Sequence, residues 1–149
     1  MYHAYKWGIA VVAQTLVGET RDNLTPEMIE AGSILVERLR QKLALSAAFW
    51  LYLTEQNLWR LFLASPLVNN DGPRKTYAII QSGLRGNLLL RRSNNSALEL
   101  NDITVLDEQH ELIRTWRKAF PTDGEIGGFR VKRTTVDGHF YEDAYIYVT

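Results

Sequence analysis

The sequence contains no cysteine among its 149 residues. This absence excludes disulfide scaffolds, thiolate zinc sites and cysteine nucleophiles. An excess of one charge is also missing, because 17 lysines and arginines balance 17 aspartates and glutamates. No global field therefore draws the protein toward nucleic acid or an anionic membrane. The longest mostly apolar stretch, residues 7–17, is too short to span a bilayer.

Histidine is scarce, and the three histidines are not spaced as metal ligands. They are His3, His110 and His139, and none has another histidine at a ligand interval. The segment DGPRK at residues 71–75 lacks the glycine spacing of a P-loop, and nothing resembles a nucleophile elbow. We therefore expect no metal site and no cofactor, and the sequence assigns no catalytic residue.

The composition itself, with 46% hydrophobic and 11% aromatic residues, is that of an ordinary globular chain. Residues 1–17 place one lysine ahead of an apolar run, as a secretory signal does. Two polar residues interrupt that run, and no small-residue cleavage site follows it. We therefore expect a cytoplasmic protein with an N-terminal arm at residues 1–24 and a single domain at residues 25–149.

Two segments in the first two thirds of the chain carry the signals that start helices. Thr25 suits the N-cap and Pro26 suits the first helical position, so a helix is predicted over 26–43. A second helix is predicted to start at Asp71-Gly72-Pro73. Its end is placed between residues 84 and 92, because two glycines weaken its later turns.

A third helix is predicted to start at Asp107, as its cap, and to end before Pro121. Three runs separate or follow these helices and are rich in strand-forming residues. They predict a hairpin of 46–53 with 58–65, a short strand at 102–106, and a hairpin of 129–136 with 139–148. The Asp-Gly pair at 137–138 is a strong signal for the turn of the last hairpin.

The first hairpin is apolar on both faces, which predicts a position inside the sheet. Helices would cover one face, and another chain is an alternative cover for the second face. The order of elements favours an α+β domain. We expect about five strands in a mainly antiparallel sheet, built from two hairpins and one short strand, with three helices packed mostly on one face.

The second predicted helix begins with two cations, Arg74 and Lys75, at the end where the helix dipole is positive. Each cation at this end lowers the stability of the helix by about 0.3–1 kcal/mol relative to an anion. A bound anion would therefore be stabilised beside the free amides. No acidic residue occurs in residues 73–98. The five cations of this stretch are Arg74, Lys75, Arg85, Arg91 and Arg92. They predict a surface for phosphate, nucleic acid or an acidic protein; the alternative is a solvated helix face neutralised by acidic residues elsewhere in the fold.

The last hairpin holds a second group of charged residues. Strand alternation places Glu142 with Phe140, Ala144, Ile146 and Val148 on a face that we expect to be buried. Arg133 or Arg130 would then pair with that carboxylate. Asp143 is placed on the other face with Tyr141, Tyr145 and Tyr147, which are ordinary strand formers and can also stack bases.

The favoured function is a non-enzymatic interaction module, as a subunit of a larger assembly or a homo-oligomer. Surplus apolar surface carries this hypothesis, including an N-terminal arm whose interface residues are Tyr2, Tyr5 and Trp7. One alternative is a small nuclease or hydrolase that uses His139, Arg133 and Glu142. Another is a nucleic-acid binder that performs no chemistry. The expected partner is a protein, a second copy, nucleic acid or an acidic protein surface, and not a membrane.

Overall fold

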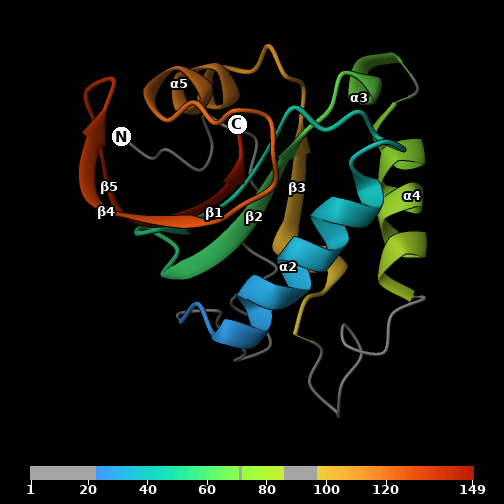
Figure 1. Cartoon of the computed structure of the whole chain (residues 1–149), viewed down its shortest axis with the longest axis horizontal. Coiled ribbons are helices and arrows are strands. Elements are labelled where there is room, and N and C mark those ends of the chain that lie inside the picture. Colours follow the sequence, from blue (N-terminus) through green and yellow to red (C-terminus); the bar gives the residue numbers. More distant parts are fainter. Residues whose placement is uncertain (1–22, 71, 86–96) are drawn as a thin grey trace.

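The computed structural model of the chain describes residues 23–70, 72–85 and 97–149. Its helices are α2 (Pro26–Leu39), α3 (Leu67–Asn70), α4 (Pro73–Arg85), the 3-10 helix η3 (Leu100–Asp102) and α5 (Glu111–Ala119). Its strands are β1 (Ala47–Leu53), β2 (Leu58–Ala64), β3 (Ile103–Leu106), β4 (Phe129–Val136) and β5 (His139–Val148). The predicted α+β class is confirmed, and α3 is a short helix that the sequence patterns do not indicate (Figure 1).

The five strands form one sheet in the order β3-β2-β1-β5-β4. The two predicted hairpins pair antiparallel, with Leu53 opposite Leu58 in the first and Val136 opposite His139 in the second. Strand β5 is also antiparallel to β1, whereas β3 runs parallel to β2. The sheet is therefore mainly antiparallel, as predicted, and the first hairpin occupies its centre.

The chain covers both faces of this sheet with its own helices. Figure 1 shows α2 and α4 beside each other on one side and α5 on the opposite side. Side chains from β2 alternate between a cluster that includes α2 and α4 and a second cluster that includes α5. All seven residues of β2 are buried. The apolar pattern on both faces of the first hairpin is explained by cover from within the chain.

Helix α2 begins and ends with the capping interactions that its sequence encodes. The amide of Met28 donates to Oγ1 of Thr25 at 3.1 Å, and Pro26 occupies the first helical position. After Leu39 the chain makes one more turn and closes with a Schellman motif. In this motif the Leu45 amide donates to the Arg40 carbonyl, and Ala44 adopts a φ of 50°. The helix predicted over 26–43 thus consists of regular helix and this closing turn.

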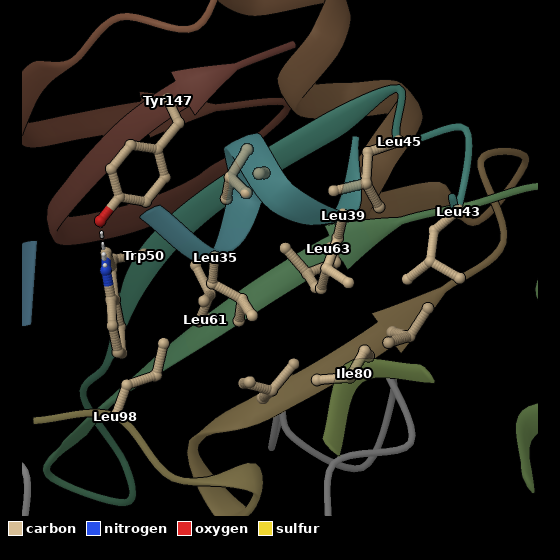
Figure 2. Packing of buried hydrophobic residues seen from close by; sticks show 14 of the residues in the cluster. Leu35, Leu39, Leu43, Leu45, Trp50, Leu61, Leu63, Ile80, Leu98 and Tyr147 are labelled. Atoms are coloured by element: carbon tan, nitrogen blue, oxygen red, sulfur yellow. Dashed lines mark hydrogen bonds between the residues drawn. The ribbon is translucent and has the colours of Figure 1, made fainter. Parts of the chain in front are cut away.

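Tyr147 of β5 connects α2 to the sheet through hydrogen bonds. The Tyr147 hydroxyl donates to the carbonyl of Ile29 at 2.6 Å and accepts a hydrogen bond from Nε1 of Trp50 at 2.9 Å. Figure 2 shows this pair at one end of the leucine-rich core. A Cβ atom on Gly32 would lie 2.2 Å from the hydroxyl oxygen. Only glycine leaves room for the phenol at this position of the helix.

The start of α5 corrects one prediction. The helix begins at Glu111, and its N-cap is His110 in place of the predicted cap Asp107, three residues earlier. The Asp107 carboxylate instead accepts a hydrogen bond from the Gln109 amide at 2.6 Å and closes the preceding turn. The imidazole of His110 accepts a hydrogen bond from the Leu112 amide at 3.1 Å. Asp107 satisfies the nearer turn, which leaves His110 to cap the helix.

The last hairpin corrects a second prediction, because its side chains do not alternate regularly along β5. Tyr141 packs with Ala144 and Ile146 in the cluster that includes α5, whereas Phe140 is 57% exposed. The Glu142 side chain is 46% exposed and so does not lie on a buried face. Opposite this segment Arg133 adopts a φ of 49°. That left-handed residue breaks the regular pleat, and the two strands change the faces on which their side chains lie.

Candidate functional site

Helix α4 is held at several points along its length. At its start, the amide and the hydroxyl of Thr76 both donate to the carbonyl of Gly72, at 3.3 and 3.1 Å. One residue later, the Tyr77 hydroxyl accepts a hydrogen bond from the Val105 amide of β3 at 2.9 Å. Near its end, Nη1 of Arg38 donates to the carbonyl of Gly83 at 3.4 Å. The first turn of α4 is therefore fixed in position on the edge of the domain.

Arg74 and Lys75 lie in this first turn, and both are exposed. Within the described part of the chain, neither side chain makes an ion pair or a hydrogen bond. The first turn of α4 contains no acidic residue. Two positive charges thus stand beside the free amides of a helix N-terminus without a counter-charge in the described structure.

The other long helices obey the dipole, which makes α4 an exception. Helix α2 has Glu27 in its first turn and Arg38 in its last, and α5 has Glu111 in its first turn. Two cations, Arg117 and Lys118, lie in the last turn of α5. The physical rule that places these charges therefore operates elsewhere in the same molecule. It does not account for Arg74 and Lys75.

Of the remaining predicted cations, the structure describes only Arg85, and this residue lies far from the pair. Arg85 lies in the last turn of α4, where a cation suits the dipole, about 16 Å along the helix from Arg74. Arg91 and Arg92 fall outside the described residues, as do Tyr2, Tyr5 and Trp7 of the N-terminal arm. The basic surface that the structure supports is therefore the pair Arg74 and Lys75.

The last hairpin holds its charges in pairs. Asp143 accepts two hydrogen bonds from the Arg130 guanidinium, from Nε and Nη2, both at 2.8 Å. This hydrogen bonding raises the pKa of Arg130 above its ordinary value. The same guanidinium lies over the ring of Trp59 at 5.5 Å from the ring centroid. Arg130 therefore pairs with Asp143 and covers an aromatic ring, which is a structural role.

Two residues of the nuclease alternative, Arg133 and Glu142, form an exposed ion pair, and the third, His139, is half-buried. Nε of Arg133 is 3.6 Å from Oε2 of Glu142, and their side chains are 80% and 46% exposed. His139 lies at the start of β5, next to the turn. A general acid or base in a hydrolase site is usually desolvated so that its pKa matches its task. This exposed pair has the character of a surface ion pair instead.

Metal-binding geometry is absent from the described residues, where no three histidine, aspartate or glutamate side chains form a group able to hold a metal ion. His110, the histidine with a defined role, caps α5, and burial lowers its pKa below the usual 6.5. A neutral imidazole suits this role, because only the unprotonated Nδ1 can accept from the Leu112 amide. The absence of a metal site remains a prediction, and His3 lies outside the described residues.

A buried arginine in the centre of the sheet is a residue that the sequence reasoning did not consider. Arg60 of β2 is 5% exposed, and its Nη1 donates to Oγ1 of Thr104 at 3.1 Å. Burial lowers the pKa of Arg60, and the nearby carboxylate of Asp102 opposes that shift. A charge in the middle of an otherwise apolar strand is the signal that could have identified this residue.

No family model, no curated protein and no solved structure matches this chain. Among the helices of the described residues, none is both long enough and apolar enough to cross a membrane. Hypotheses about function therefore depend on the geometry of this chain alone.

Proposed function

We propose that this protein is a non-enzymatic interaction module that binds an anionic partner through the first turn of α4. One observation supports the proposal: Arg74 and Lys75 are exposed at the positive end of a helix and pair with no acidic side chain of the described residues. An anion there would meet two side-chain cations and the free amides of the helix N-terminus. The partner belongs to an assembly in which this chain is a subunit.

The alternative of a solvated basic face is less well supported. It requires acidic residues elsewhere in the fold to neutralise Arg74 and Lys75, and the described residues supply none within ion-pair distance. Without such pairs, the two cations oppose the dipole with no compensating interaction, which costs about 0.3–1 kcal/mol for each. Retention of an unfavourable charge is easier to understand when a partner supplies the counter-charge.

Neutralising both cations tests the proposal. The variant Arg74→Gln/Lys75→Gln should bind an anionic probe more weakly than the parent protein, measured with heparin, an oligonucleotide and a polyglutamate peptide by fluorescence anisotropy. The three probes separate a general anion surface from one that selects phosphate or carboxylate. The affinity should also fall steeply with salt, because binding releases condensed counterions from a nucleic acid or similar polyanion.

The matched control is Arg117→Gln/Lys132→Gln, which removes two exposed cations from α5 and β4 and leaves α4 intact. The net charge of the two double variants is the same. Equal losses of affinity in both would show that the probes respond to overall charge, and would refute a specific role for α4.

A further inference from the structure

A groove of about 600 Å³ separates α5 from the turn between β4 and β5. Glu111, Arg114 and Lys118 line the side formed by α5, and Asp137 lines the side formed by the turn. Val136, which also lines the groove, is 5% exposed and belongs to the apolar cluster under α5. This volume lies within the range typical of small-molecule sites, which combine apolar lining with a few polar groups.

The charges on the two sides of the groove do not neutralise each other. Among the described residues, Arg114, Lys118 and Asp137 make no ion pair and no side-chain hydrogen bond. Arg114 and Lys118 are four residues apart on α5, so their side chains lie one above the other and repel. Arg114 and Lys118 thus lie across the groove from Asp137, and Glu111 adds a second carboxylate at the start of α5.

We infer that this groove binds a small dipolar ligand of the aminoalkanoate class. The ligand carboxylate lies toward Arg114 and Lys118, and its ammonium group lies toward Asp137. A single anion would meet the carboxylates of Asp137 and Glu111, and a single cation would meet the two basic side chains. A ligand with both charges satisfies both sides, so charge complementarity selects it.

The surroundings of Tyr141 support this assignment of charges. Burial raises the pKa of Tyr141 to about 12, and the carboxylates of Glu111 and Asp137 contribute to that rise. The phenol therefore lies close to the two carboxylates of the groove, Glu111 and Asp137, and remains neutral at ordinary pH. The negative charge near Asp137 therefore comes from carboxylates alone, and these are what the cationic end of a ligand meets.

The direct test is a titration of the full chain with 4-aminobutyrate, glycine and 6-aminohexanoate, followed by amide NMR shifts. At least one of these probes should give saturable shifts at Thr115, Asp137 and Gly138 in the millimolar range. Butyrate and butylammonium, each with one of the two charges, should bind at least about tenfold more weakly. Absence of saturable shifts at these amides with all three probes would overturn the inference, as would equal binding of butyrate.

Single-residue variants test whether Arg114 and Asp137 bind the ligand. Arg114→Gln and Asp137→Asn should each weaken binding of the responsive probe at least about tenfold. Asparagine tolerates the positive φ of residue 137 in this turn, so Asp137→Asn preserves the fold. The control Arg117→Gln, an exposed cation of α5 outside the groove, should leave binding unchanged. If Asp137→Asn retains the parent affinity, the inference is wrong. Arg74→Gln/Lys75→Gln should bind the probe normally, so this test is independent of the proposed function.

Discussion

His110 satisfies a backbone donor at the start of α5, where its Nδ1 accepts from the Leu112 amide. Burial lowers the pKa of this imidazole in the folded state below the value of 6.5 that it has when unfolded. The unfolded chain therefore binds the proton more readily than the folded chain. The stability that the neutral cap contributes is present above that unfolded value and is lost as the pH falls below it.

The variant His110→Asn tests this titration, because asparagine is a good N-cap that does not ionise in this range. Between about pH 7.5 and about pH 5, the free energy of unfolding of the parent should fall more than that of His110→Asn. Urea unfolding at the two pH values measures the difference. Equal losses in both proteins would contradict the role of the neutral imidazole.

At the scale of elements, the two edges of the sheet are protected differently. On one edge, Tyr77 of α4 accepts a hydrogen bond from the Val105 amide, so this donor of β3 is not open to another strand. On the other edge, β4 carries the exposed Lys132, and the left-handed Arg133 interrupts the regular pairing with β5. Both devices disfavour the addition of a strand from another chain.

Tyr77→Phe removes the hydroxyl and leaves the Val105 amide without its acceptor. We expect a loss of about 1–3 kcal/mol in the free energy of unfolding, because the donor lies at the contact between α4 and β3. Urea unfolding measures the loss, and hydrogen exchange should be faster at Val105. The control Tyr52→Phe removes a hydroxyl whose hydrogen bond to Asn57 is exposed, and should cost less. A larger loss in the control would contradict this account.

Local signals predicted most of these elements from the sequence. The Asp-Gly turn located the last hairpin, and φ values of 51° at Asp137 and 81° at Gly138 match the turn type that this pair favours. Thr25 and Pro26 located the start of α2. These features depend on neighbouring residues, which sequence patterns describe well.

Features that depend on contacts between distant residues were not predicted. The face on which Tyr141 lies follows from the left-handed Arg133 on the opposite strand, and periodicity within β5 could not show it. The parallel pairing of β3 with β2 brings Leu61 and Ile103 together, although α3, α4 and η3 lie between the two strands in the chain. At the candidate site, the sequence located Arg74 and Lys75 in a first turn, but only the structure showed their lack of acidic neighbours.

At the scale of the whole molecule, 17 basic residues balance 17 acidic residues, so the net charge cannot select a charged partner. Any preference for an anion must come from the local arrangement of charges. At physiological salt, screening limits the field of such charges to about 8 Å. The first turn of α4 therefore acts on a partner that touches it, and the many acidic residues elsewhere have little influence there.

Self-association or docking through the N-terminal arm remains a separate prediction for the whole molecule. Residues 1–18 lie outside the described structure, and their aromatic and apolar content would be an aggregation hazard if exposed to solvent. Deletion of residues 1–18 should lower the mass in solution, measured by light scattering after size exclusion, while circular dichroism shows a folded core. An unchanged mass would remove self-association through the arm.

The central claim, that Arg74 and Lys75 are retained for an anionic partner, is tested most directly by reversing both charges and measuring stability and binding together. In Arg74→Glu/Lys75→Glu, two acidic groups would lie at the positive end of α4, where each contributes about 0.3–1 kcal/mol. The structure shows no ion pair for the change to break among the described residues. We therefore predict a higher free energy of unfolding together with loss of binding to the anionic probe. A less stable variant that still binds the probe would contradict the account.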